Sequence, residues 1–567
     1  MSLMRSFFLF IIFLPSYLFA CCRTTFVPRS QDDNIARYLR RDQLSVEENN
    51  ACYTMLVMPS YEHSLRSKKI SEHFFGTSCL KFSGSRVENR GVHDLLADYF
   101  GLPADFESTV QFRPRIQNLS VDIAGSCNLS WLYEGLFFKL RSQFVHTRWN
   151  MRMCEQVKTK GEQFHIAGYL SGGNLRLERT QLPRDVVTVL KGGTTFGDMQ
   201  DPLQFGKICG TQTKTEVANI KAELVYNLTR NDDYFVAINF FLGVPTGSRI
   251  TAEYLFEPIV GNGHCWELGG GFSGTYQAWN SDDKKQYCSL FGHLQLSHLF
   301  ASHQRRSFDL KNGCLSRYML LTTLDKTHDD ILKVPQGVSP ALQYTGHLFH
   351  AINKTTFDCK VGVAIKADFL IGATYLYHDW SFDVGYNLWI KSSEKLKCRQ
   401  RLQSGKYGIK GDAQLYGFFV HDGIGGASEI PVSLNSTQSK ATIYSGQGDL
   451  NTDFTNANDD NPAIAYENAT TDPLQVPTAA DSVALSIPVN DVNGSNPPIL
   501  LTDSDIDNCS ALTATVSSSS LFTRVSYIFK EREDWVPYFS GGLLCELSHS
   551  KGTYSRIGLW LEGGFLY

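Results

Sequence analysis

The sequence contains no apolar run of membrane-spanning length after residue 20, and its mean hydropathy is only −0.20. Because a transmembrane helix needs about 20 predominantly apolar residues, a helical membrane protein is not expected. Basic residues are not in excess either, since 53 Lys and Arg stand against 57 Asp and Glu for a net charge of −4. With no basic run in the chain, no nucleic-acid partner is predicted.

Motifs for catalysis and metal binding are also missing. The sequence has no nucleophile elbow, no metal-binding helix, no paired carboxylates at a strand end and no phosphate-binding loop. Ser548 and His549 are adjacent, but neighbours on a strand point to opposite faces and do not form a catalytic pair. The 14 cysteines form no Cys-x-x-Cys pair, and their spacing does not reveal disulfide partners. We therefore predict no enzyme activity, no catalytic or metal-binding residue and no cofactor.

The N-terminus carries an export signal. Arg5 precedes an apolar run from Phe7 to Phe19, which is followed by Ala20, and this is the layout of a secretory signal peptide. We predict that residues 1–20 are removed. Cys21 comes next and permits a lipoprotein alternative, although Phe19 is bulky for that motif. Residues 21–106 have a mixed composition and are predicted to form a small N-terminal segment, either periplasmic or acting as a plug.

From residue 108 onward the dominant feature is alternation with a period of two. The segment 380–391, "WSFDVGYNLWIK", puts Trp, Phe, Val, Tyr and Leu on one face and Ser, Asp and Asn on the other, as a strand with one apolar face requires. Such segments run for about 11–17 residues, whereas soluble strands usually hold about five or six and a tilted membrane strand needs about 9–11. Their length favours a bilayer.

The repeated pattern predicts an all-β fold, a transmembrane antiparallel β-barrel of about 14 strands (range about 12–18) over residues 107–567. Residues 421–515 are rich in Asn, Asp, Ser, Thr and Pro without a period, which predicts a long polar extracellular loop. Short turns at 229–233, 280–285 and 531–535 would lie on the periplasmic side with both termini. The candidate strands are 108–126, 130–143, 146–156, 215–229, 234–246, 265–280, 286–302, 316–325, 360–377, 380–392, 406–420, 516–529, 535–548 and 553–567.

The last strand gives a more specific signal. Ile557, Leu559, Leu561, Phe565 and Tyr567 share one apolar face, and the opposite face mixes charged residues and glycines with Trp560 and Leu566. This ending resembles the insertion signal of bacterial outer-membrane β-barrel proteins, which finish on an aromatic residue. The resemblance implies an outer-membrane location, contact with the lipid bilayer, and recognition of Phe565 and Tyr567 by the outer-membrane assembly machinery. The strand count is similar to that of the outer-membrane fatty-acid transport family, whose barrels carry an N-terminal plug.

The opposite face of the predicted strands carries charges, which are costly in a dry core but natural in a wet lumen. We therefore predict a porin-like channel or passive transporter for small solutes, which works by diffusion without covalent chemistry. Opposite charges that merely pair across a plugged barrel are the alternative. The candidate lumen-lining residues are Lys139, Arg141, Lys221, Glu223, Glu267, Lys366, Asp368, Asp383, Lys391, Arg556 and Glu562.

Two other functions stay open at this point. A surface adhesion or structural barrel would bind a partner through the 421–515 loop. A soluble secreted β-sandwich glycoprotein would alternate in the same way along its inner faces, and Asn-x-Ser/Thr sequons such as those at Asn118 and Asn468 would support it. The sequence does not indicate the oligomeric state.

Overall fold

The fold is described from a computed structural model of the chain. It covers residues 22–38, 52–163, 165, 168–172, 182–231, 233–282, 285–325, 342–399, 401–423, 426–447, 498–529 and 535–567. The predicted signal peptide and residues 448–497 of the predicted polar loop lie outside this part of the chain. No helix among the residues so covered is long and apolar enough to cross a membrane.

Twelve antiparallel strands form one closed barrel. Each strand pairs with the next barrel strand along the chain, and the last strand, β24, pairs with the first, β1. Closure leaves no unpaired edge, and a single closed sheet excludes the two-sheet sandwich considered above. The barrel strands are β1 (Tyr53–Leu65), β5 (Arg115–Asn128), β6 (Leu136–Asn150), β8 (Thr211–Arg230), β9 (Tyr234–Val244), β10 (Glu267–Asn280), β11 (Gln286–Ser307), β15 (Thr356–Tyr377), β16 (Trp380–Lys391), β22 (Val516–Ile528), β23 (Val536–Ser548) and β24 (Ser555–Leu566).

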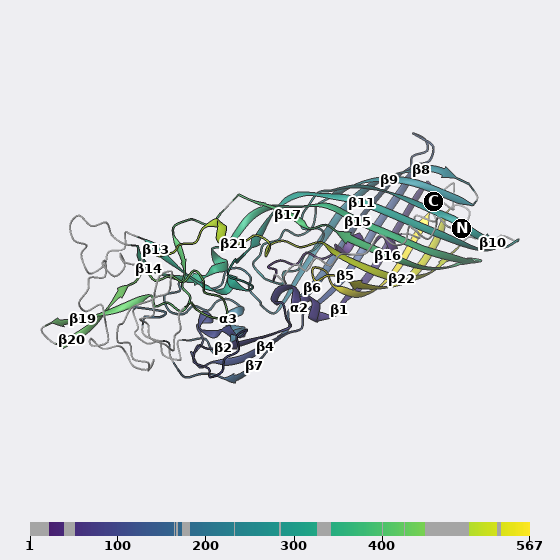
Figure 1. Ribbon diagram of the computed structural model, residues 1–567. Coiled ribbons are helices and arrows are strands. Elements are labelled where there is room, and N and C mark those ends of the chain that lie inside the picture. Colours follow the sequence, from purple (N-terminus) through teal and green to yellow (C-terminus); the bar gives the residue numbers. More distant parts are fainter. Residues whose placement is uncertain are drawn as a thin grey trace, which may run out of the picture.

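The two ends of the barrel differ (Figure 1). At the end that carries the C-terminus, short turns join the strands at 129–135, 231–233, 281–285, 378–379 and 529–535. At the other end all the connections except the one between β23 and β24 are long, and they fold into a second body, which we call the head. The head consists of the described residues between β1 and β5, β6 and β8, β9 and β10, β11 and β15, β16 and β22, and β23 and β24. Short turns at one end and long connections at the other are the asymmetry that the sequence predicts.

The head has its own small sheets and the largest apolar cluster of the protein, which includes Phe74, Phe100, Leu320 and Ile409. A disulfide joins Cys359 at the head end of β15 to Cys398 of the neighbouring β17. The head elements are α2 (Ser67–Phe75), β2 (Cys79–Ser83), β3 (Leu95–Leu96), β4 (Glu107–Phe112), β7 (Met153–Thr159), α3 (Val186–Leu190), β12 (Asp309–Leu310), β13 (Leu320–Asp325), β14 (Gln343–His350), β17 (Glu394–Cys398), β18 (Tyr407–Ile409), β19 (Tyr416–Gly423), β20 (Gly426–Ser433) and β21 (Ile506–Asp507).

Twelve strands lie within the predicted range, and the difference from 14 has specific causes. The predicted strand 130–143 and the first part of the predicted strand 146–156 belong to one continuous strand, β6, and the end of the second lies in β7 of the head. The predicted strands 316–325 and 406–420 are head segments that contain β13, β18 and part of β19. Most of β13 is buried on both faces, and burial on both faces gives an apolar run that resembles a barrel strand in sequence.

The boundary predicted between residues 106 and 107 does not divide the fold. Residues 53–65 are β1, the first barrel strand, and residues 66–106 belong to the head. β1 is absent from the predicted strands because Pro59 and the inward apolar residues Leu56 and Met58 obscure its alternation. Among the described residues, 22–38 belong to neither set of elements: this segment starts against the head, where the Thr24 amide donates to the Ser510 carbonyl, and continues into the barrel.

The outer surface of the barrel is apolar. On β24, Leu559 and Leu561 are 51% and 50% exposed, whereas Arg556 and Glu562 point inward and are buried. The end near the C-terminus also carries a ring of exposed aromatic side chains, as outer-membrane barrels do at the level of the lipid headgroups. These aromatic residues include Tyr53, Trp279, Trp380, Trp535 and Tyr567.

Inside the barrel, large rings lie over glycines of the neighbouring strand. A Cβ atom on Gly542 would come within 2.1 Å of the Trp560 ring, and a Cβ on Gly385 within 2.4 Å of the Phe522 ring. Both rings are buried. Glycine is therefore required here for close approach, because a side chain on β23 or β16 would displace the ring.

Candidate functional site

The lumen of the barrel is the candidate functional site, because charged side chains from most of the strands converge there. Alternation along each strand sends apolar side chains outward and polar ones inward. The predicted lumen-lining residues are all buried or half-buried in the structure. The charged wall also includes Glu62 of β1, Asp122 of β5, Arg524 of β22 and Glu546 of β23.

Residues 22–38, which we call the lumen segment, occupy this space. The segment begins at the head, where the Thr24 amide donates to the Ser510 carbonyl, and runs into the barrel through two turns of 3-10 helix, η1 (Gln31–Asp33) and η2 (Ile35–Arg37). Every residue from Thr24 to Tyr38 is buried. Its charged side chains form three groups of contacts with the wall.

The first group is centred on Arg29. One guanidinium nitrogen lies 2.6 Å from a carboxylate oxygen of Asp368, and the other donates to Asn387 at 2.9 Å and lies 3.6 Å from Glu546. These partners come from β15, β16 and β23. Arg29 thus joins three strands on one side of the barrel to the lumen segment.

The second group is centred on Asp33. Its carboxylate accepts hydrogen bonds from the Lys221 Nζ at 2.7 Å and from the Lys366 Nζ at 2.8 Å. Glu267 of β10 contacts the same two lysines at 3.4 and 2.5 Å, and Asp32 lies 3.1 Å from Lys221. Two lysines of the wall are therefore held between carboxylates of the wall and carboxylates of the segment.

The third group surrounds Arg37 and Tyr38. The Arg37 guanidinium pairs with Glu62, the Tyr38 hydroxyl donates to Asp122, and the Arg141 guanidinium lies 4.7 Å from the centre of the Tyr38 ring. These contacts reach β1, β5 and β6. Together the three groups distribute the contacts of the segment over most of the barrel wall.

The wall residues also bind one another. Arg556 of β24 lies 2.9 Å from Glu62 and 2.7 Å from Glu546, so it connects the first and third groups. Arg524 pairs with Asp383 at 2.9 Å. Removing one member of a buried ion pair typically costs about 3–5 kcal/mol because the other charge stays buried without a partner. This network therefore fixes the position of the segment.

The remaining predicted residues have mixed roles. Lys391 donates to the Val27 carbonyl of the segment at 2.9 Å. Glu562 accepts from Tyr538 and Ser540 at 2.8 Å each, and Glu223 accepts from Asn239. Lys139 is buried in the wall. The candidate insertion residues Phe565 and Tyr567 face outward and are 36% and 62% exposed.

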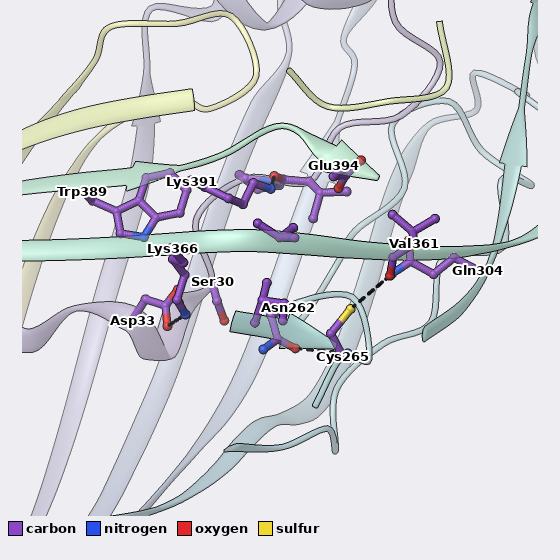
Figure 2. Close-up of a pocket in the computed structure, with 14 residues that line it drawn as sticks. Ser30, Asp33, Asn262, Cys265, Gln304, Val361, Lys366, Trp389, Lys391 and Glu394 are labelled. Carbon is purple, nitrogen blue, oxygen red and sulfur yellow. Dashed lines mark hydrogen bonds and ion pairs between the residues drawn. The ribbon is translucent and has the colours of Figure 1, made fainter. Parts of the chain in front are cut away.

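A small cavity remains between the segment and the wall (Figure 2). Its volume is about 20 Å³, which is room for about one water molecule. Figure 2 shows Lys366 directed at Asp33 and the Trp389 indole lying above them. The other labelled lining residues are Ser30, Asn262, Cys265, Gln304, Val361, Lys391 and Glu394. A solute larger than water requires a displacement of the segment to enter this region.

The sequence analysis does not identify Arg29, Asp32, Asp33, Arg37 and Tyr38 as site residues. The available signal is the dense charge of "RSQDDNIARY", residues 29–38, shortly after the predicted signal peptide, which is unusual for a short segment without a strand period. No group of three or more His, Cys, Asp and Glu that could hold a metal ion occurs among the residues that the structure describes.

No family model matches this chain, and no curated protein matches it in sequence. Solved structures that align with it include the COG4313 outer membrane channel from Pseudomonas putida F1, at 8% identity, a TM-score of 0.29, and coverage of 91% of this chain and 95% of that chain. The Pseudomonas putida toluene transporter TodX aligns at 5% identity and a TM-score of 0.29 over 96% and 97% of the two chains. A Pseudomonas aeruginosa FadL homologue aligns at 6% identity and a TM-score of 0.26 over 91% and 90%. These scores are low, and the assignment to a closed antiparallel barrel rests on the strand pairing of this chain.

Proposed function

We propose that this protein is an outer-membrane channel or passive transporter for small polar solutes, and that the lumen segment is its plug. Solutes would pass by diffusion when the segment leaves the lumen, without covalent chemistry. In this proposal the protein is exported, contacts the lipid bilayer through its apolar outer face, and is inserted by the outer-membrane assembly machinery.

The bilayer part of the proposal is supported by the outer surface. Exposed Leu, Ile, Val and Phe side chains alternate with buried polar ones along the strands, and aromatic residues gather near one end. In water, such a band would be a large exposed apolar surface, which soluble monomers rarely carry. In lipid the same band is the expected outer face of a barrel.

The observation that carries the channel proposal is the way the lumen is filled. If the barrel interior served only as a core, apolar side chains would fill it at a lower free-energy cost, because buried charges lose their hydration. Here the segment instead meets a charged wall through Arg29, Asp33 and Arg37. When the segment leaves, water can hydrate those wall charges and the lumen becomes a polar passage. The same barrel is closed when the segment is docked.

The test is ion conductance in planar bilayers of the full protein and of a variant that lacks residues 24–38. We expect rare openings from the full protein and sustained conductance from the variant. In the deletion background, Lys221→Glu with Lys366→Glu should shift selectivity toward cations, since both side chains then line the open passage. Heat-modifiable gel mobility controls for folding, and silent bilayers from folded deletion variant would refute the channel.

A second candidate function is supported by the size of the head. An adhesion or structural barrel would use the head, including the 421–515 region, to bind a partner outside the cell. Deleting residues 448–497 should then abolish surface binding, whereas the channel proposal expects conductance of the plug-deleted protein to persist after that deletion. The two functions are compatible in one molecule, and each assay reports on one of them.

A further inference from the structure

The first residue of the lumen segment lies against a cysteine of the head. The backbone amide nitrogen of Cys22 is 3.1 Å from the Sγ of Cys314, and both side chains are thiols in this structure. Cys22 is 2% exposed, and Cys314 is half-buried. The two residues are 292 positions apart in the chain, so the fold brings them together.

The surroundings hold this pair in place. Arg317 donates to the Arg23 carbonyl at 3.0 Å and to the Phe74 carbonyl at 2.9 Å. The Arg23 amide donates to the His73 carbonyl at 2.9 Å. The backbone next to Cys22 is thus held by α2 on one side and by the segment around Cys314 on the other, which keeps the two residues close.

We propose that Cys22 and Cys314 form a disulfide that ties the lumen segment to the head, and that the segment leaves the lumen readily only after this bond is reduced. The covalent part of the proposal rests on the geometry of the two residues. The regulatory part rests on the plug function proposed above.

The bond would form by thiol–disulfide exchange with a disulfide of a small thiol or of an envelope protein, RS–SR. The Cys314 thiolate attacks one sulfur, which forms a mixed disulfide and releases RS⁻. The Cys22 thiolate then attacks the Cys314 sulfur and releases a second RS⁻, so that two protein thiols and RS–SR give one protein disulfide and two RSH.

Cys314 is suited to the first attack. Hydrogen bonding from Cys22 lowers the pKa of the Cys314 thiol to about 7, so a large fraction is thiolate at neutral pH, and the thiolate is the nucleophile. Cys314 is also the more accessible of the two. Hydrogen bonding to Cys314 and burial raise the pKa of the Cys22 thiol, which makes Cys22 the second residue to react.

The covalent test uses the purified full protein under air. Free thiols are alkylated in denaturant without reductant, and the digest is examined by tandem mass spectrometry. We expect the Cys22–Cys314 peptide pair, with the Cys359–Cys398 pair as the internal control. Finding Cys22 and Cys314 both alkylated while the control pair is intact would overturn the proposal, and so would a cross-link of Cys314 to Cys21.

The regulatory test compares reductant sensitivity of wild type, Cys22→Ser, Cys314→Ser and a Cys359→Ser/Cys398→Ser control. Trypsin cleavage after Arg37, which is 2% exposed in the lumen, reports release of the segment without reference to conductance. Reductant should speed this cleavage at least tenfold in wild type and in the control variant, but not in the two single variants, which should already be fast.

The outcomes separate the two proposals. If reductant speeds cleavage but bilayers of the plug-deleted protein are silent, the disulfide stands and the channel function fails. If the plug-deleted protein conducts while reductant changes neither cleavage nor conductance of wild type, the channel stands and the regulatory role of the disulfide is refuted.

Discussion

Arg29→Met is the substitution that tests the lumen network most sharply. Among the described residues, Arg29 is the ion-pair partner of Asp368, and Asn387 is the other side chain that donates to this carboxylate. Methionine keeps much of the length of the arginine stem but removes the charge. In the docked state of the variant, Asp368 would remain buried without a counter-ion.

The expected cost follows from the burial of the pair. Arg29 and Asp368 have side-chain exposures of 2% and 7%, and removing one partner of such a pair costs about 3–5 kcal/mol. When the segment leaves, water hydrates Asp368, so this cost falls on the docked state. Since about 1.4 kcal/mol corresponds to a factor of ten, the ratio of docked to released segment should fall by roughly 10²-fold to a few thousand-fold.

Trypsin cleavage after Arg37 measures this ratio, because Arg37 is buried when the segment is docked. If docking and release are fast relative to cleavage, the cleavage rate follows the population of the released state. We expect Arg29→Met to raise the rate by about 100-fold or more while heat-modifiable mobility of the barrel is unchanged. Bilayer recordings should show a parallel increase in open probability.

The matched control is a double-mutant cycle that combines Arg29→Met with Asp368→Asn. Arg29→Met/Asp368→Asn removes both charges and leaves no uncompensated ion, so its cleavage rate should lie within about tenfold of wild type. Two results would refute the role of this ion pair in holding the segment in the lumen. One is cleavage of Arg29→Met as slow as that of wild type, and the other is cleavage of Arg29→Met/Asp368→Asn as fast as that of Arg29→Met.

Three further predictions concern other parts of the molecule. Deleting Phe565–Tyr567 should reduce the yield of heat-modifiable protein, and assembly at normal yield would rule out their role as an insertion signal. Burial lowers the pKa of His73 from 6.5 to about 4. Between these pH values the unfolded chain binds more protons than the folded one, so the stability of the fold should decrease as the pH drops from 6.5 to 4. His73→Gln, which can still donate to the Thr25 carbonyl, should reduce this pH dependence of the thermal unfolding temperature, and an unchanged pH dependence would contradict the prediction. Gly542→Leu should destabilise the barrel by about 1–3 kcal/mol by displacing the Trp560 ring, as measured by urea unfolding in detergent, and a neutral effect would show that the ring moves freely.

The barrel could be predicted from sequence where one face of a strand meets lipid and the other meets polar groups. Residues 380–391 and the strand of Leu559 and Leu561 show this clearly, since the period of two determines which side chains point outward. The same rule identified Lys221, Lys366 and Asp368 as inward-facing. Their burial follows from the local pattern and does not depend on which strands are neighbours.

The lumen segment and the head could not be predicted in this way. The pairing of Arg29 with Asp368 joins residues 339 positions apart, and no local period indicates it. In β13, leucine and threonine side chains are buried on both faces, so the local sequence does not distinguish this head strand from a barrel strand. In β1, Pro59 and the inward apolar residues Leu56 and Met58 interrupt the pattern although the strand completes the barrel.

The central claim is that the lumen segment lies inside a membrane-embedded barrel. Replacing Tyr38 with p-azidophenylalanine, which has nearly the same shape, and irradiating intact membranes would test it directly. Because the Tyr38 ring lies beneath Arg141 and its hydroxyl donates to Asp122, we predict intramolecular cross-links to peptides of β5 and β6. Cross-links to lipid or to another protein, with none to these two strands, would contradict the account.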